Sequence, residues 1–199
     1  MPAPDKHQIA DAIAALERGG VVLMPTDTIY GLHARATDAR ATQRIAEMKG
    51  RDEEKPFVVI GASIAQLESL GSLFSERARS AVSELWPGPL TAIVALRAPI
   101  AASRGASTIA LRVPALPWLR ELLERSGPLA STSANRSGEP PLLDPKTVSF
   151  PGIDFIIDNG PQKGKASTIV DFTGDEPRFI REGESFFTQK VWKTLRKSL

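Results

Sequence analysis

One short basic segment of this chain carries side chains suited to holding phosphate groups. Residues 49–56, KGRDEEKP, place Lys49, Arg51 and Lys55 within seven residues. Arginine offers phosphate oxygens a planar fork of donors, and lysine offers a compact point charge. The three acidic residues after Arg51 partly neutralise the segment, so a solvated surface loop is the alternative, and by itself the more common, interpretation.

Two further segments are rich in hydroxyl groups. Residues 25–32, PTDTIYGL, set two threonines around an aspartate directly after an apolar run, where α/β folds usually bind ligands. Residues 131–138, STSANRSG, offer four hydroxyls and a carboxamide as neutral donors to phosphate or ribose. The sequence contains neither GxxxxGK[ST] nor GxSxG, which excludes a P-loop and a nucleophile elbow. Each segment could also be an ordinary polar turn.

Polar residues also lie in or next to later apolar runs. In STIALRVP, Thr108 and Arg112 are four residues apart and therefore share one face of a strand. ASTIVDF and RFIREG place Ser167 and Arg181 near expected strand ends. An isolated arginine at a strand end is usually part of a surface ion pair, so these positions gain meaning only together with the others.

The composition narrows the class of protein. A length of 199 residues predicts one domain, and the absence of cysteine excludes thiolate, disulfide and iron–sulfur chemistry. Two histidines make a multi-histidine metal site unlikely to form, so we expect no protein metal centre. A net charge of +2 lacks the large cationic excess of a dedicated nucleic-acid binder. The N-terminus does not resemble a signal peptide and no long apolar run is present, which predicts a cytoplasmic protein without membrane contact.

The hydrophobic pattern indicates interleaved helices and strands. Helices are expected at about residues 6–18, 38–48, 63–70, 75–86, 116–125 and 188–197. Strands are expected at 21–24, 57–61, 90–96, 107–113, 128–132, 154–157, 167–172 and 178–181. Residues 25–32 are interpreted as a polar turn, and 139–152 as a loop with one short helical turn. Without a strict alternation of strand and helix, the pattern favours a mixed sheet in an α/β fold.

Taken together and in this order, these segments resemble the YrdC/Sua5 family of threonylcarbamoyl-AMP synthases. The resemblance runs from about residue 9 to 183 and is carried by PTDTIYGL, Lys49–Gly50–Arg51, PGPLT at 87–91, RVP at 112–114, STSANRSG, STIVD and REG. It implies a YrdC/RibB-like α/β fold, with an open twisted sheet of parallel and antiparallel strands, surrounding helices and a central positively charged cavity. It also implies one YrdC-like domain over residues 1–199, the short, TsaC-like form of the family.

The resemblance further implies an enzyme, a nucleotidyltransferase that converts ATP, L-threonine and bicarbonate into L-threonylcarbamoyladenylate and pyrophosphate. The product would serve the t6A37 modification of tRNA through a tRNA threonylcarbamoyl transferase complex. Mg²⁺ would accompany ATP, held mainly by phosphate oxygens and water. Lys49 and Arg51 fall on the catalytic pair at the ATP phosphates. The other nucleotide-binding positions are Lys55, Thr108, Ser133, Asn135 and Arg181, and the threonine-binding positions are Thr28, Arg112, Ser131 and Ser167, with Arg112 suited to the carboxylate.

Two alternatives remain open at this stage. One is a module without synthase activity that binds double-stranded or ribosomal RNA, which the basic residues Lys190, Lys193, Arg196 and Lys197 would support. The other is a paralogue that hydrolyses or transfers a different acyl or carbamoyl group. Two departures from the family pattern are also expected to matter. Ile60 stands where longer relatives often carry a histidine, so one contact to threonine would be lost, and His33 is expected to reshape the pocket rim.

Overall fold

The strands form one mixed sheet. The computed structural model describes residues 3–50, 55–136 and 139–197. In that part of the chain ten strands run in the order β10-β9-β5-β6-β3-β7-β2-β1-β8, with the short β4 paired to β5. β1 with β8, β3 with β6 and β5 with β9 are parallel, and the other pairs are antiparallel. The predicted mixed sheet is confirmed.

Most element bounds lie within a few residues of the predicted ones. The strands are β1 (Val22–Pro25), β2 (Tyr30–Arg35), β3 (Val58–Ile60), β4 (Ser72–Leu73), β5 (Leu90–Leu96), β6 (Thr108–Arg112), β7 (Leu129–Ser133), β8 (Phe155–Ile156), β9 (Thr168–Asp171) and β10 (Arg178–Arg181). The helices are α1 (Lys6–Glu17), α2 (Ala39–Lys49), α3 (Ile64–Glu68), α4 (Glu76–Leu85), α5 (Pro117–Ser126) and α6 (Ser185–Lys197), with 3-10 turns η1 (Ala101–Ser103) and η2 (Pro145–Thr147).

Local capping explains where two of these helices begin and end. The carboxylates of Asp5 and Asp38 accept hydrogen bonds from the first-turn amides of α1 and α2. Gly50 ends α2 in the left-handed conformation, with a φ of 55°, which a residue without Cβ adopts at little cost. Because the helix ends there, Lys49 lies on its last turn, at the start of the basic segment.

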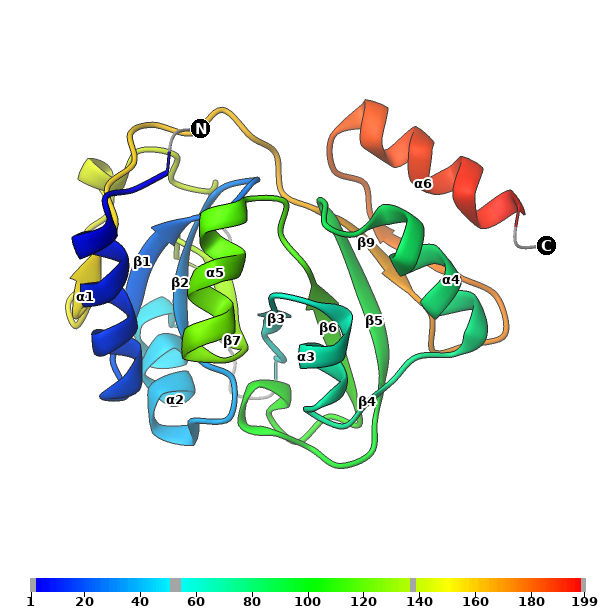
Figure 1. Cartoon of the computed structure of the whole chain (residues 1–199), viewed down its shortest axis with the longest axis horizontal. Helices are drawn as coiled ribbons and strands as arrows, with labels where there is room; N and C mark the ends of the chain where they lie inside the picture. Colours follow the sequence, from blue (N-terminus) through cyan, green and yellow to red (C-terminus); the bar gives the residue numbers. More distant parts are fainter. Residues whose placement is uncertain (1–2, 51–54, 137–138, 198–199) are drawn as a thin grey trace.

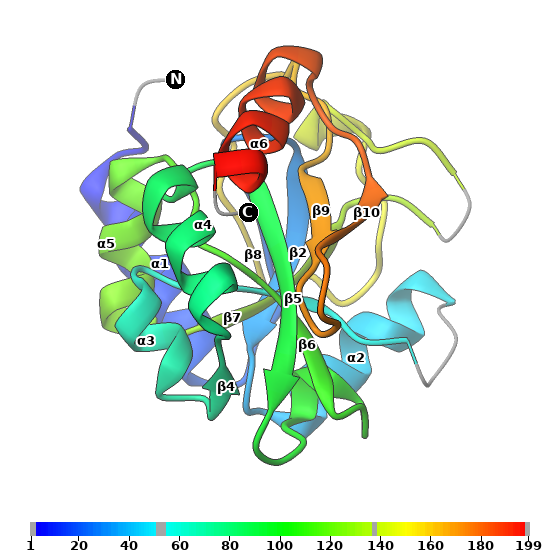
Figure 2. The same ribbon diagram turned by 90° about the vertical axis from the view of Figure 1, so that its right-hand side faces the viewer.

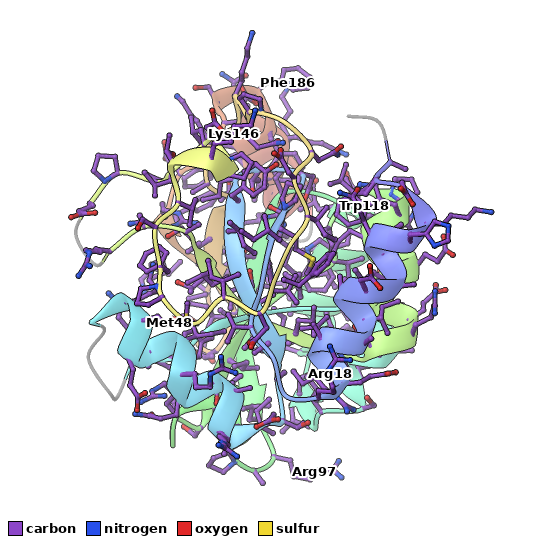
Figure 3. The ribbon with its side chains drawn as sticks, turned by 90° about the vertical axis from the view of Figure 1, so that its left-hand side faces the viewer. Arg18, Met48, Arg97, Trp118, Lys146 and Phe186 are labelled. Atoms are coloured by element: carbon purple, nitrogen blue, oxygen red, sulfur yellow. The ribbon has the colours of Figure 1, made fainter. Side chains whose placement is uncertain are left out.

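The helices cover both sides of the sheet (Figure 1). In Figure 2, α1, α3, α4 and α5 lie on one side of the sheet and α2 on the other, while α6 packs beside α4. Figure 3 shows side chains filling the space between these layers. Within the described residues, no helix combines the length and the apolar character that crossing a bilayer requires.

Strand register separates the two faces of the central strands. Val58 pairs with Ala110 on β6 and with Ser131 on β7, and Ala110 pairs with Ile93 on β5, so these side chains share one face. The residues between them, among them Val59, Ala92, Leu111 and Ala130, belong to the main hydrophobic core. One face therefore packs in the main core, and the other lines a cavity beside a second hydrophobic cluster that includes Ile60 and Leu129.

One predicted turn is shorter than expected, because its second half belongs to a strand. The segment 25–32 turns only at Thr26–Ile29, where the Thr26 amide donates to the Ile29 carbonyl at 3.1 Å, and β2 begins at Tyr30. Tyr30, Leu32 and Ala34 are fully buried in the main core, so β2 lies between β1 and β7 inside the sheet. Glycine and histidine in the alternate positions weakened the apolar pattern that would have indicated a strand.

Candidate active site

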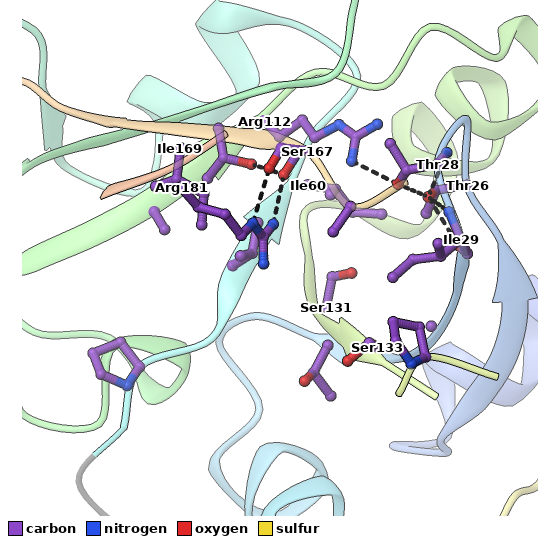
Figure 4. A pocket seen from close by; sticks show the side chains of 18 of the residues that line it. Thr26, Thr28, Ile29, Ile60, Arg112, Ser131, Ser133, Ser167, Ile169 and Arg181 are labelled. Atoms are coloured by element: carbon purple, nitrogen blue, oxygen red, sulfur yellow. Dashed lines mark hydrogen bonds between the residues drawn. The ribbon is translucent and has the colours of Figure 1, made fainter. Parts of the chain in front are cut away.

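A cavity of about 540 Å³ opens on the non-core face of the central strands (Figure 4). Its volume falls in the range of small-molecule binding sites. Every predicted site residue that the structure describes lines it, namely Thr28, Lys49, Lys55, Thr108, Arg112, Ser131, Ser133, Asn135, Ser167 and Arg181. Arg51, the other predicted residue, lies outside the described residues. Segments far apart in the sequence therefore converge on one hollow.

Arg112 is fixed by three different partners. Its Nε donates to the Gly88 carbonyl at 3.3 Å, one terminal nitrogen donates to Thr28 Oγ1 at 3.0 Å, and the other donates to Asp27 Oδ1 at 2.5 Å. The side chains of Arg112 and Asp27 are only 6% and 10% exposed. A guanidinium has five N–H donors, so two remain, one on each terminal nitrogen. They suit a carboxylate, which accepts such paired donors.

The turn that carries Thr28 is itself held rigidly. The hydroxyls of Thr26 and Thr28 are 2.8 Å apart and hydrogen-bonded, and Thr26 Oγ1 also donates to the Ile29 carbonyl at 3.0 Å. Gly164 passes so close that an added Cβ would lie 1.9 Å from the Thr28 carbonyl oxygen. The turn is thus bonded from within and covered by the chain around residue 164.

Ser167 joins Arg181 to β5. Arg181 donates from Nε to the Ser167 carbonyl at 3.0 Å and from a terminal nitrogen to Ser167 Oγ at 3.2 Å. Ser167 Oγ lies 2.8 Å from Thr91 Oγ1, and the two hydroxyls share a hydrogen bond. Burial, and then the charge of Arg112, lower the pKa of Arg181. We call this set the Arg112 side of the cavity: Thr26, Asp27, Thr28, Thr91, Arg112, Ser167 and Arg181.

Lys49 has main-chain partners across the cavity. Its ammonium donates to the Ser133 carbonyl at 2.6 Å and to the Asn135 carbonyl, and the residue is 4% exposed. The Asn135 amide nitrogen donates to the Glu139 carbonyl at 2.6 Å, which closes the loop after β7 on itself. The end of α2 is therefore bonded to this loop. We call Lys49, Lys55, Ser133 and Asn135 the Lys49 side.

The lining chemistry suits anionic ligands. Four basic side chains line the cavity, and no aspartate or glutamate does so among the described residues. Nor do three histidine, cysteine or acidic side chains gather as a metal centre in the described ranges. Hydroxyl and amide groups supply neutral donors and acceptors. A divalent cation entering this cavity would therefore depend on ligand oxygens, with at most hydroxyl or amide oxygens from the protein.

Two residues outside the predicted set, Thr91 and Ile60, line the cavity, and one residue expected at its rim does not. Thr91 lines the cavity, although a single threonine within the apolar run LTAIVAL gave no functional signal. Ile60 also lines the cavity, as an apolar side chain in register with Arg112. The prediction that His33 shapes the rim is wrong, because His33 is fully buried and its ring lies against Gly31. Burial lowers the pKa of His33 to about 4.

Comparison with known proteins agrees with this geometry. The family model Sua5_yciO_yrdC, described as "Telomere recombination", matches residues 14–183. The chain belongs to this Sua5/YciO/YrdC family. The match includes every segment that contributes a predicted site residue, from Thr28 to Arg181.

Individual members of the family are similar in sequence to this chain over most of its length. A Mycobacterium tuberculosis relative is 36% identical over 188 residues, which are 92% of this chain and 87% of that protein. The Bacillus subtilis threonylcarbamoyl-AMP synthase is 38% identical over 184 residues, which are 88% of this chain but 53% of that protein. The crystal structure of Pyrococcus abyssi Sua5 complexed with L-threonine matches with a TM-score of 0.87 and 34% identity, over 96% of this chain and 58% of that one. The chain thus spans just over half the length of these last two relatives.

Proposed function

We propose that this chain is an L-threonylcarbamoyladenylate synthase, which forms threonylcarbamoyl-AMP and pyrophosphate from ATP, L-threonine and bicarbonate. The observation that carries the proposal is the convergence of ten predicted residues, from segments far apart in the sequence, on one cavity. The names of the relatives support the same activity. The product would pass to a tRNA threonylcarbamoyl transferase complex in the cytoplasm for the t6A37 modification.

The Arg112 side would hold threonine. The two remaining donors of Arg112 bind its carboxylate, and Thr28, Ser131 and Ser167 offer hydroxyls to its polar groups. Ile60 contributes an apolar surface beside Arg112, which suits the threonine methyl group. A Pyrococcus abyssi relative with L-threonine bound has the same fold.

The Lys49 side would hold ATP. Lys49, Lys55, Ser133 and Asn135 line one part of the cavity, and Thr108 lies on β6 on the same face as Arg112. Arg51 is assigned to the phosphates through the Lys49–Gly50–Arg51 segment alone. Mg²⁺ would enter with ATP, held by phosphate oxygens and water, because the described lining provides no carboxylate.

The reaction then requires positioning and charge stabilisation, and no protein nucleophile. The threonine amine adds to the carbon of bicarbonate and water leaves, which gives a carbamate. A carbamate oxygen attacks the α-phosphorus of ATP, the bond to the β-phosphate oxygen breaks, and pyrophosphate departs. Cations and hydroxyls fixed around the reacting groups stabilise the developing charge.

A direct assay tests the proposal. Purified protein, Mg²⁺, ATP, bicarbonate and L-threonine are mixed, and the products are followed by pyrophosphate release and mass spectrometry. A new adenylate with the mass of threonylcarbamoyl-AMP is expected, and it should vanish when threonine is omitted. ATP-independent RNA binding without any adenylate would instead identify a binding module. An adduct formed from another acyl or carbamoyl donor would identify a paralogue.

A further inference from the structure

Two guanidinium groups lie at one corner of the cavity. Arg112 and Arg181 both line it, and the charge of Arg112 acts on Arg181. Asp27 balances Arg112 and does not itself line the cavity. Arg181 has no acidic partner among the described residues, and both of its hydrogen bonds go to Ser167. Within the described residues, Arg181 is thus an exposed cationic group at this corner without a counter-charge.

Two hydroxyl side chains, of Thr91 and Ser167, lie near these two arginines. Ala92 on β5 pairs with Leu111 on β6, so the next step of the antiparallel ladder places Thr91 beside Arg112. Thr91 shares a hydrogen bond with Ser167, and Ser167 accepts from Arg181. Figure 4 shows Arg112, Ser167 and Arg181 close together in the pocket. The Thr91 hydroxyl is therefore bonded to Ser167, which Arg181 contacts, and its strand position lies next to that of Arg112.

The N–H donors of Arg112 and Arg181 that have no partner among the described residues could bind a second planar anion next to threonine. Arg181 uses two of its five N–H groups, so three remain. The two remaining donors of Arg112 are taken by the threonine carboxylate in the proposed function. N-carboxythreonine, the carbamate of that reaction, carries two carboxylate groups separated only by a nitrogen and the α-carbon. Two neighbouring guanidiniums provide one planar fork for each of them.

We propose that Arg181 and Ser167 form the bicarbonate subsite, with the fully buried Thr91 positioning the Ser167 hydroxyl. The inference rests on the proposed function and extends it. The amine lone pair forms the new N–C bond, the C–OH bond breaks, and an amine proton leaves with the hydroxide as water. The carbamate oxygens remain on Arg181, between threonine and the α-phosphate. This position also explains why a residue that the resemblance assigns to ATP is bonded to the threonine side.

Bicarbonate dependence tests this subsite in two matched variants. Arg181→Gln removes the cation, and Thr91→Val replaces one hydroxyl with a methyl group at nearly constant shape. Initial rates are measured in sealed, CO₂-depleted buffer at saturating ATP and threonine, after melting temperatures verify folding. We expect the bicarbonate KM to rise at least tenfold in Arg181→Gln and about threefold in Thr91→Val. The dissociation constant of threonine, measured by calorimetry without bicarbonate, should change less than twofold in both.

One control variant leaves the proposed subsite intact. Thr108→Val, on the same face but away from the corner, should raise the KM of ATP and leave that of bicarbonate unchanged. An unchanged bicarbonate KM in Arg181→Gln, with weaker threonine or ATP binding, would overturn the subsite while the synthase activity stands. If the wild-type protein forms no adenylate, the proposed function fails. The subsite is then tested by line broadening of ¹³C-bicarbonate with threonine present. Wild-type protein should broaden the signal and Arg181→Gln should not. Absence of broadening with the wild-type protein would overturn the subsite.

Discussion

The two sides of the cavity are built in different ways. On the Arg112 side, buried side chains fix one another: Asp27, Thr28 and the Gly88 carbonyl each take one donor of Arg112. On the Lys49 side, the ammonium is bonded to main-chain carbonyls of the loop after β7, at Ser133 and Asn135. A site held by packed side chains loses little freedom when its ligand binds. Under the proposed function, selection of the amino acid would be built into the fold, whereas ATP binding would depend on the loop that Lys49 contacts.

Loss of Lys49 should have the largest effect of the variants considered. Lys49→Ala removes a cation and releases the loop at Ser133 and Asn135, so turnover should fall roughly ten- to a thousand-fold. Arg51→Ala should lower turnover by a factor in the same range, because Arg51 is assigned to the phosphates. Steady-state kinetics and threonine calorimetry measure both effects. Threonine affinity should change less than twofold, and the exposed Lys146→Ala serves as the control. Equal losses in ATP and threonine binding would contradict the separation of the two sides.

Removal of Asp27 should damage the Arg112 side alone. Asp27→Ala leaves a buried guanidinium without its counter-charge, which costs about 3 kcal/mol of unfolding free energy. The threonine KM should rise about tenfold because Arg112 loses its orientation, while the KM of ATP stays within twofold. Denaturant unfolding and steady-state kinetics check both values. Asp27→Asn, which keeps one acceptor oxygen, should lie between wild type and Asp27→Ala. An ATP effect as large as the threonine effect would refute a positioning role.

The stability of the fold should depend on pH through His33, which is fully buried in β2. Its folded pKa of about 4 lies below the ordinary 6.5, so the unfolded chain binds more protons between these values. Stability is therefore unaffected above pH 6.5 and falls as pH drops toward 4, by about 2 kcal/mol at pH 5. Denaturant unfolding at pH 7 and pH 5 measures this fall. His33→Gln should lose most of it, and a variant with the wild-type pH dependence would exclude His33 as the cause.

The smallest effect is expected at Thr108. Thr108→Val removes one hydroxyl from the nucleotide part of the cavity, and a single hydrogen bond is worth about 1 kcal/mol. The KM of ATP should therefore rise about fivefold, with threonine binding unchanged. Steady-state kinetics with each substrate varied in turn decides the point. A selective effect on threonine would mean that the boundary between the two sides lies elsewhere on β6.

The sequence predicted residues that line one cavity, but it did not indicate the hydrogen bonds among them. Thr108 and Arg112 were expected on one strand face, and both line the cavity, because strand periodicity alone fixes that relation. Asp27 and Arg112 are paired across 85 residues, and no local pattern contains such a contact. The same holds for two of the partners of Lys49, the carbonyls of Ser133 and Asn135, because any residue could supply a main-chain oxygen. Partner identity depends on tertiary approach, which motifs do not encode.

The errors about elements have an equally local cause. β2 was mistaken for a turn because Gly31 and His33 stand at alternate positions of a strand that is buried on both faces. The same two residues explain the error about His33, since its ring occupies the space that a side chain at position 31 would need. The short β4 offers two residues, too few for a periodic signal. Long amphipathic helices such as α2 and α5 had neither problem.

The position of β10 at the margin of the sheet has a consequence for how ligands enter and leave the cavity. Among the described strands, β10 is the last at one margin and pairs with β9 alone, through a ladder that contains an irregularity between Phe179 and Arg181. Marginal strands open more readily than interior ones, so its amides should exchange with solvent earlier than those of β6. Brief detachment of this strand would swing Arg181 outward while Arg112 stays in place. Such opening would widen the cavity beside Arg112 and would give substrates a route past β10.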